Sequence, residues 1–560
     1  MTAVALPRLK SGGERSLNLA TATAAGFLAL FVAAPLGTVF WRSLLDRNDV
    51  FIGLANYVEF LTRPALSQSI WNSVWIAGLT VILVLPPAFA YAFAVTRTRM
   101  PGRAVFRLIA QLPLLAPSLL PAISLVYLFG NQGILRHWLM GESIYGPIGI
   151  LLAEAFYVFP HAVMILIVAL STADARLYEA AESLGAGTLR RFLTITLPGA
   201  RYGLISAGTV IFTLVVTDFS APKVIGGQFN VLATDIYKQV VGQQNFGMGA
   251  VVGMALLIPA VLAFVVDWIG QKKQTALLSA RAQPYRPTSR PLGDMAALAF
   301  CLLVAGFVVG ILAMAAYASL VAYWPYNLSL TLKNYDFRLA DAAGWASYAN
   351  SLILAAWTAA LGAPLIFTAA WLVERGPAHA ALKAAVRLLA ILPLAVPGLV
   401  LGLAYIFFFN APWNPLNGLY GGMAILVFCT VAHFYTVCHL TAATALKQLD
   451  TEFENVSASM GVSPWRTFML VTVPLCLPAI LDIAIYLFVN AMTTVSAVVF
   501  LYAPATKTAS VAVLNMDDAG ETAAAAAMAM MIVYTSGGVR LLHAGMSWAL
   551  HRKTQAWRRG

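Results

Sequence analysis

Twelve long apolar segments constrain the fold of this chain more than any other feature of its sequence. Each contains about 20 or more mainly apolar residues, the length that an α-helix needs to cross the hydrocarbon core of a bilayer. Backbone groups inside a bilayer must be hydrogen-bonded within the protein, and a helix meets that need within one segment. We therefore predict an all-α polytopic membrane protein with twelve spans, at residues 18–41, 69–95, 105–129, 147–171, 198–217, 248–269, 295–322, 347–373, 384–409, 420–445, 474–500 and 523–547.

The composition agrees with this class of protein. Apolar residues make up 60% of the 560 residues and charged residues only 10%, whereas soluble proteins are about one quarter charged. A basic stretch with Arg8, Lys10 and Arg15 precedes the first apolar segment, which is too long for a cleavable signal, so we predict a retained helix. The four cysteines have no metal-ligand spacing and are predicted to pack in the core: Cys301, Cys429, Cys438 and Cys476.

The net charge of +12 is explained by membrane topology. If the N-terminus lies in the cytoplasm, 26 of the 35 Lys and Arg residues fall on the cytoplasmic side and nine on the other. Cytoplasmic loops of membrane proteins carry such an excess of basic residues. We predict that both termini are cytoplasmic, that the lipid membrane surrounds the chain, and that nucleic acid is not a partner.

The two halves of the chain repeat each other with an offset of 276 to 280 residues. An even number of helices separates the copies, so both halves share one topology and are related by an axis along the membrane normal. Parallel repeats of this kind place a translocation path between the halves. We predict two six-helix halves, 1–280 and 281–560. The repeated motifs are Asn56-Tyr57 with Asn334-Tyr335, Asn72-Ser73 with Asn350-Ser351, Leu112-Pro113-Leu114 with Leu392-Pro393-Leu394, and Phe156-Tyr157 with Phe434-Tyr435.

Two polar segments, 174–198 and 450–474, lie between the fourth and fifth spans of their halves, on the predicted cytoplasmic side. In the first, Asp174 is suited to cap a helix, and small alanines on that helix would let a partner approach closely. Gly185 and Gly187 would end the helix, and Pro198 is tolerated at the start of the next one. The alternative is an amphipathic loop that rests on lipid headgroups.

The first polar segment carries Glu-Ala-Ala, then a glycine, then Ile-x-Leu-Pro, at Glu179, Ala180, Ala181, Gly185 and Ile195 to Pro198. This pattern resembles the signature of the membrane subunits of binding-protein-dependent ABC importers. The resemblance implies the type I ABC importer permease fold in the bacterial inner membrane. It also implies that these residues couple the chain to a separate ATPase homodimer, which binds ATP and Mg²⁺, so that this chain holds no cofactor. A periplasmic solute-binding protein would deliver the substrate.

The second copy of the motif is weaker. Asn455, Val456 and Ser457 replace Glu-Ala-Ala, whereas Gly461 and Pro474 keep their positions. We expect the same coupling role there, with looser or asymmetric docking.

Two further stretches narrow the resemblance. The runs from Thr217 to Ala250 and from Val511 to Ala527 look like the fused two-half permeases assigned to uptake of 2-aminoethylphosphonate. Similar double-length permeases import ferric iron or thiamine. The resemblance therefore implies 2-aminoethylphosphonate as the small-molecule substrate, with ferric iron and thiamine as the alternatives.

Ionisable groups inside a membrane are costly and are candidates for the substrate path. Asp482 is the strongest, because it is expected to be deepest and has no cation nearby in the sequence; Glu154 and His433 are weaker candidates. A zwitterionic substrate would need an anion site, which Lys223 beside two glycines could supply. Its ammonium group would need a carboxylate, Asp218 or Asp235. The alternatives are helix packing for the buried groups, and a surface that receives the binding protein for Lys223, Asp235 and Lys238.

The sequence contains no Gly-x4-Gly-Lys-Ser/Thr phosphate loop, so ATP hydrolysis is not expected in this chain. No His/Cys cluster has metal-ligand spacing, and no nucleophile lies beside a suitable base. We therefore predict that the protein is not an enzyme. A secondary transporter driven by an ion gradient is the alternative; it would need charges in the membrane but no paired docking segments.

Overall fold

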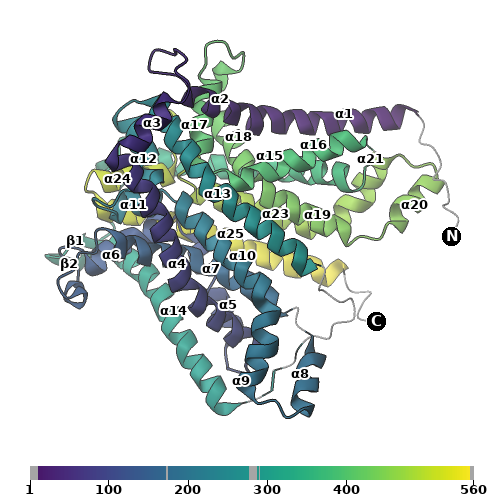
Figure 1. Cartoon of the computed structure of the whole chain (residues 1–560), viewed down its shortest axis with the longest axis horizontal. Coiled ribbons are helices and arrows are strands. Elements are labelled where there is room, and N and C mark those ends of the chain that lie inside the picture. The colour runs from purple at the N-terminus through teal and green to yellow at the C-terminus, as the bar shows by residue number, and fades with distance from the viewer. Residues whose placement is uncertain are drawn as a thin grey trace. The chain divides into compact units, whose positions relative to one another are not determined.

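In the computed structural model the chain is almost entirely helical (Figure 1). The structure describes residues 11–171, 174–275, 285, 287–288, 290–376 and 378–554. Within these residues the one sheet is an antiparallel pair of short strands, β1 (Val321–Tyr323) and β2 (Asn327–Leu330). The prediction of an all-α polytopic fold is confirmed.

Eight helices of the described chain are long and apolar enough to cross a membrane, and up to twelve spans result if each of four bent helix pairs counts as one. All of them fall on segments predicted from the sequence. The unbent spans are α1 (Ser11–Leu28) continued through the π-helical turn η1 (Ala29–Ala33) into α2 (Ala34–Ser43), α4 (Pro64–Arg97), α7 (Pro147–Ser171), α9 (Thr188–Arg191) continued through η4 (Phe192–Thr196) into α10 (Leu197–Thr217), α13 (Phe246–Thr275), α14 (Pro291–Leu320), α15 (Trp345–Glu374) and α25 (Thr522–Thr554).

The third span of each half is sharply bent at the repeated Leu-Pro-Leu motif. Its two arms meet at 99° in the first half and at 116° in the second. Ala116 and Val396 are extended at these bends, because a following proline ring disfavours the helical conformation. The arms are α5 (Arg103–Ile109), α6 (Leu119–Phe129), α16 (Ala380–Ile391) and α17 (Gly398–Phe409), with the 3-10 turns η2 (Leu112–Leu115) and η8 (Leu392–Ala395) between them.

The fifth span is continuous in the first half and broken in the second. A bend of 74° separates α22 (Val473–Leu475) from α23 (Leu477–Thr493). Pro478 lies in the first turn of α23, where the first half has Tyr202, so the second half carries one more helix-restricting residue. The fourth span of the second half is also bent, by 55° between α18 (Met423–His433) and α19 (Tyr435–Lys447).

Shorter elements connect the spans. They are α3 (Ala55–Thr62), η3 (Arg136–Leu139), α8 (Ala175–Ser183), α11 (Ser220–Ile225), α12 (Leu232–Tyr237), η5 (Lys238–Gly242), η6 (Lys333–Tyr335), η7 (Phe337–Leu339), η9 (Asn417–Leu419), α20 (Glu452–Ser459), α21 (Pro464–Thr467), η10 (Phe468–Thr472), η11 (Pro504–Thr506) and α24 (Ala509–Asp518).

The chain packs into two units, and each unit contains segments of both sequence halves. Unit 1 consists of Met1–Arg42, Trp345–Val511 and Ile532–Gly560, and unit 2 consists of Ser43–Gly344 and Ala512–Met531. The first membrane helix of each half therefore packs with the other half. The boundary predicted at residue 280 separates the two sequence repeats. The two packing units differ from these repeats, because each unit contains the first membrane helix of the other half.

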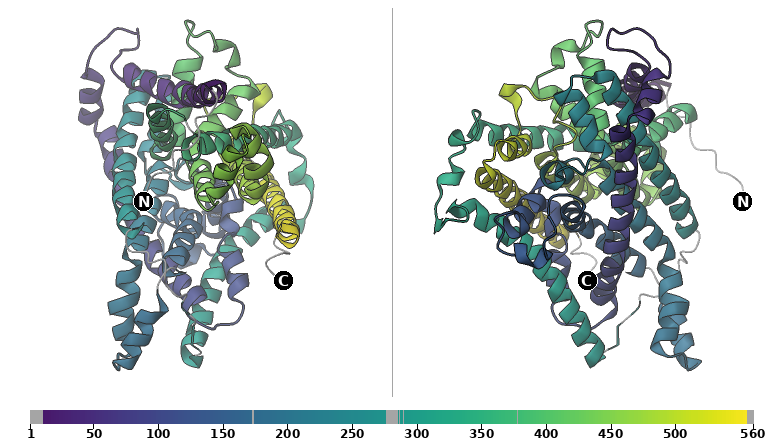
Figure 2. Two further views of the ribbon diagram at one scale, coloured as in Figure 1. Left: turned by 90° about the vertical axis from the view of Figure 1, so that its right-hand side faces the viewer. Right: turned by 60° about the vertical axis from the view of Figure 1, so that its left-hand side comes forward.

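Specific contacts hold the exchanged helices. In unit 1 the Tyr405 hydroxyl of α17 donates to the Phe31 carbonyl at 2.7 Å, within the segment that continues α1. In unit 2 the Arg99 backbone N–H donates to Asp294 of α14 at 2.9 Å. Both views in Figure 2 place the N-terminal end of α14 and the α8–α9 region at the same end of unit 2.

The repeated Asn-Ser motif fixes the same connection in both halves. The hydroxyl of Ser73 accepts the N–H of Leu232, the first residue of α12, at 2.8 Å. The hydroxyl of Ser351 accepts the N–H of Ala509, the first residue of α24, at 2.7 Å. The motif therefore positions a short helix after the fifth span of each half.

Candidate functional site

The first polar segment forms the helix α8 at one end of unit 2. Asp174 is its N-cap and accepts a hydrogen bond from the Arg176 N–H, as predicted. One face of α8 is fixed to the unit, because Ala175 and Tyr178 are buried and the Tyr178 hydroxyl lies 3.0 Å from Thr196 Oγ1.

The other face of α8 is open. Glu179 and Ala180 are exposed and Ala181 is partly exposed. Leu177 and Leu184 are 58% and 86% exposed. Apolar side chains exposed together beside small residues are typical of an interaction surface.

Gly185 and Gly461 end the two short helices in the same way. Their φ angles are +73° and +70°, a left-handed conformation that glycine adopts without strain. In both halves the following N–H reaches back to a carbonyl five residues earlier: Ala186 to Ala181, and Val462 to Ser457, each at 2.9 Å. The polar segments thus share their backbone geometry although their sequences differ.

The second polar segment forms α20, which differs from α8 in its packing. No residue of α20 is buried, and Asn455 is exposed together with Val456 and Met460. This helix is held by a charged contact instead of a buried aromatic ring.

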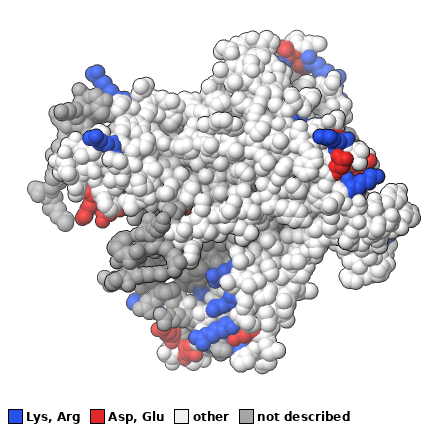
Figure 3. Space-filling model, turned by 180° about the vertical axis from the view of Figure 1, so that it is seen from behind, with Lys and Arg blue, Asp and Glu red and all other residues white. Residues whose placement is uncertain are grey.

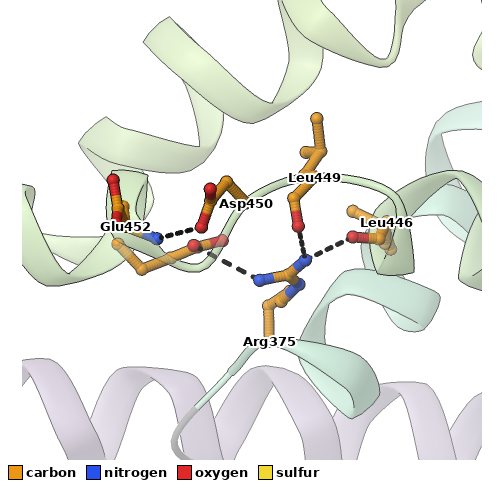
Figure 4. A network of polar contacts seen from close by, with 6 residues as sticks. Arg375, Leu446, Leu449, Asp450 and Glu452 are labelled. Carbon is orange, nitrogen blue, oxygen red and sulfur yellow. Dashed lines mark hydrogen bonds and ion pairs between the residues drawn. The ribbon is translucent and has the colours of Figure 1, made fainter.

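Arg375, at the end of α15, makes that contact (Figure 4). Its guanidinium donates to the carbonyls of Leu446 and Leu449 at 2.5 and 2.6 Å, at the end of α19. Its Nη1 lies 3.4 Å from a carboxylate oxygen of Glu454 in α20. One side chain therefore ties α20 to two membrane-spanning helices of unit 1.

Arg97 occupies the equivalent position in unit 2. Its Nη2 donates to the Leu170 carbonyl at 2.6 Å, at the end of α7. Position 178, which corresponds to Glu454, is a tyrosine, and the Arg97 guanidinium lies 5.1 Å from its ring centre and 4.3 Å from that of Tyr285. Unit 2 thus uses cation–π contacts where unit 1 uses an ion pair.

Pro198 and Pro474 each follow a π-helical turn, η4 and η10. The backbone N–H groups of Leu197 and Val473 donate to carbonyls five residues earlier. The extra residue of a π turn accommodates a proline, which lacks an N–H and crowds the carbonyl four residues before it. The helix that contains Pro198 consequently begins at Thr188, ten residues before the predicted start.

The other predicted residues of unit 2 lie at the far end of α4. Lys223 has an acidic partner, because its ammonium lies 2.8 Å from Asp518 of α24 and 5.6 Å from the ring centre of Tyr237. Asp235 is buried and accepts a hydrogen bond from the Ser69 hydroxyl. Burial raises the pKa of the Asp235 carboxyl above its usual range, and the hydrogen bond opposes this shift.

Asp218 is a helix-capping residue. Its carboxylate accepts the Ala221 N–H at 2.9 Å, at the start of α11. Nearby Glu154 of α7 is fully buried, and its carboxyl group faces that of Asp218. Lys223, Asp218 and Asp235 therefore have structural partners, and the structure does not group them around one open anion site.

Asp482 lies in α23 of unit 1. Its carboxylate is 60% exposed and lies 3.2 Å from His543 Nε2 of α25. The sequence offered no cation close to Asp482, and the structure supplies a histidine 61 positions away.

A cavity of about 600 Å³ in unit 2 contains residues that sequence reasoning missed. On its wall the Thr522 hydroxyl lies 3.0 Å from the Tyr127 hydroxyl, and Asp517 acts electrostatically on Tyr127 and Tyr145. Burial and the neighbouring Asp518 raise the pKa of Asp517 to about 6. No sequence signal joins these groups, which come from distant elements. The polar wall residues include Asn131, Gln132, Tyr145, Lys333, Asp336 and Glu521.

No group of three or more His, Cys, Asp and Glu side chains in the described residues is arranged to hold a metal ion.

Comparison with known proteins gives a family match in each half. The family described as binding-protein-dependent transport system inner membrane component matches residues 88–274 and 362–546. The two matched regions contain the two polar segments and the spans around them.

Full-length relatives are similar over most of the chain. The chain is 30% identical over 523 residues to the ferric transport system permease protein FbpB of Actinobacillus pleuropneumoniae, covering 90% of this chain and 74% of that protein. It is 24% identical over 513 residues to the Fe(3+)-transport system permease protein FbpB 2 of Haemophilus influenzae, covering 91% and 96%. The thiamine transport system permease protein ThiP of Brucella abortus is 33% identical over 217 residues, covering 37% and 39%.

A solved structure of a bacterial alginate ABC transporter, in complex with an alginate-bound periplasmic protein, aligns with 48% of this chain and 96% of its own chain. The sequence identity is 15% and the TM-score is 0.40.

Proposed function

Because the chain belongs to the family of binding-protein-dependent transport system inner membrane components, we propose that it is the membrane-spanning permease subunit of an ATP-driven importer. The observation that carries this proposal is the pair of polar segments. α8 and α20 end at left-handed glycines with the same backbone hydrogen bonds, and both leave an apolar face exposed. A partner that grips both helices would need this shared geometry.

The partner is an ATPase homodimer in the cytoplasm that binds ATP and Mg²⁺. Residues Glu179, Ala180, Ala181, Gly185 and Pro198 form the contact in unit 2, and Asn455, Gly461 and Pro474 form it in unit 1. This arrangement requires the N-terminus and the polar segments to lie on the same, cytoplasmic, side. A periplasmic binding protein delivers the substrate to the opposite side.

Ferric iron is the substrate that we propose first. Two ferric permeases are similar to at least 90% of this chain, whereas the thiamine permease is similar to 37%. The resemblance of two sequence runs implied 2-aminoethylphosphonate, but the relatives found are ferric and thiamine permeases, and Lys223, the predicted anion site, is already paired with Asp518.

The test is reconstitution of the chain in proteoliposomes with its ATPase and binding protein. Substrate-loaded binding protein is placed outside, ATP is placed inside, and uptake of labelled ferric iron, thiamine and 2-aminoethylphosphonate is measured. We expect ATP-dependent uptake of ferric iron. ATP-dependent uptake of thiamine alone or of the aminophosphonate alone would contradict ferric iron as the substrate and would still support an ATP-driven importer.

A second arm separates the importer from an ion-coupled transporter. The chain alone is given a proton or sodium gradient without ATP, and the same three substrates are offered. Uptake under these conditions would contradict the proposed function, because the docking helices would then have no role.

A further inference from the structure

A cavity of about 680 Å³ lies beside α8 in unit 2. Its walls combine aromatic rings with three arginines, and one carboxylate, Asp294, faces them. Asp294 already accepts the backbone N–H groups of Arg99 and Arg290. The charged and polar end of the cavity is formed by Arg97, Arg191, Arg290 and Thr188, and its apolar walls by Phe89, Phe93, Phe192 and Phe300.

Arg97 is the buried cation of this cavity. It is 7% exposed, and its Nε and Nη1 have no hydrogen-bond acceptor in the described chain. Only Nη2 is bonded, to the Leu170 carbonyl. A buried guanidinium with two unused donors is unfavourable unless an acceptor is present.

The equivalent arginine of unit 1 has the acceptors that Arg97 lacks among the described residues. Arg375 is satisfied by two carbonyls and by the carboxylate of Glu454 from α20. In unit 2 the corresponding position of α8 is Tyr178, which offers a ring face and no anion. Unit 1 thus supplies its own acidic group, and the described residues of unit 2 supply aromatic rings and no carboxylate to Arg97.

We propose that the cavity beside α8 binds a phosphate group joined to an apolar body, and that its source is the headgroup of an anionic phospholipid. Arg97 is the main hydrogen-bond donor to the phosphate, and the phenylalanine walls cover the glycerol and the start of an acyl chain. Arg191 and Arg290 add positive charge, although Arg191 is paired with Glu182 at 2.9 Å and Arg290 donates to Thr188.

The position of the cavity favours a lipid. It lies where the apolar span of α4 ends and that of α14 begins, and basic pockets between membrane helices commonly bind acidic headgroups. In Figure 3, Lys and Arg side chains gather at the lower end of the view, where Figure 1 shows α8 and α9.

The test counts lipids on the purified full chain. The protein is placed in nanodiscs of phosphatidylcholine with a minor share of phosphatidylglycerol, and retained lipids are counted by native mass spectrometry. We expect one phosphatidylglycerol that Tyr178→Glu displaces, since this substitution supplies the carboxylate that unit 1 has at position 454. Retention should fall about tenfold, as for loss of one charge-assisted contact.

Matched variants guard against misfolding. Tyr178→Phe keeps the ring on Arg97 and should retain the lipid, and Arg375→Gln changes only the equivalent arginine and should also retain it. Melting temperatures are recorded for every variant. Equal retention by the wild type and Tyr178→Glu, with both folded, would overturn the proposal.

A last arm separates the two sources of phosphate. Glycerol phosphate is offered to the chain in pure phosphatidylcholine nanodiscs. No binding supports the lipid, whereas binding that depends on Tyr178 in the same way would overturn the lipid assignment in favour of a soluble phosphate. None of these measurements requires transport, so their failure is distinct from failure of the proposed function.

Discussion

Single side chains decide how each short polar helix is held. Arg375 donates to two carbonyls at a helix end and forms an ion pair with Glu454. Removing a charged, mostly buried hydrogen-bond donor of this kind lowers the free energy of unfolding. Arg375→Met should lower stability by about 2–3 kcal/mol, because hydrogen bonds to a charged group are lost. The melting temperature of the purified chain measures this loss.

The control for that prediction is Arg387→Met. Arg387 lies 3.5 Å from Glu374, but its side chain is 53% exposed, so the change should be below about 1 kcal/mol. Similar losses for both variants would show that Arg375 has no special anchoring role.

Asp517 gives stability a dependence on pH. Its pKa is about 6, above the usual value near 4, so the folded chain binds this proton more tightly than the unfolded chain. The resulting stabilisation is complete below about pH 4 and is lost as the pH rises through about 6. Asp517→Asn should therefore raise the melting temperature at pH 7.5 and have a much smaller effect at pH 4.

The neighbouring carboxylate should respond with the opposite sign. Asp518 is the ion-pair partner of Lys223. Asp518→Asn should therefore lower the free energy of unfolding at pH 7.5 by up to about 1 kcal/mol, which is measured as a lower melting temperature. If Asp517→Asn lowers the melting temperature at pH 7.5, the assignment of the raised pKa to Asp517 is wrong.

At the scale of elements, α8 and α20 have equal end geometry but unequal surfaces. Gly185→Asp should reduce ATPase coupling more than Gly461→Asp, because α8 carries the intact Glu179-Ala180-Ala181 surface. We expect about tenfold less binding-protein-stimulated ATPase activity, since an uncompensated charge in a docked interface costs at least ~1.4 kcal/mol. ATPase assays on the reconstituted complex measure this difference.

Gly185→Asn is the matched variant. Asparagine tolerates the left-handed conformation about as well as aspartate and adds no charge, so it should retain most of the coupling. Equal damage by aspartate at positions 185 and 461 would mean that the partner grips both helices alike.

Most helices and turns were predictable from the sequence, and each element or contact that was not has a physical reason. Span positions follow from apolar length, and the cap at Asp174 and the turn at Gly185 follow from local chemistry. The bends before Pro117 and Pro397 were not predicted, because a proline restricts a helix without fixing its angle. The partners of Lys223 and Asp482 come from hundreds or tens of residues away, where local patterns carry no information.

At the scale of the whole molecule, each packing unit needs segments from both sequence halves. Fragments 1–280 and 281–560 should therefore be unstable alone and associate when co-expressed, since each lacks a membrane helix that its partner holds. Co-purification through a tag on one fragment measures this association. Two separately stable, monodisperse fragments would contradict the exchange, which no local sequence signal predicted.

The continuous fifth span of the first half affects how a movement of α8 is passed into the membrane. From Thr188 to Thr217 it is one helix of 30 residues, a rod of about 45 Å at 1.5 Å per residue. A displacement applied at the α8 end is carried along this rod as a lever. The counterpart in the second half has an elbow of 74° at Cys476, where the same push turns one arm against the other. Equal strokes on the two polar helices would therefore produce unequal movements within the membrane.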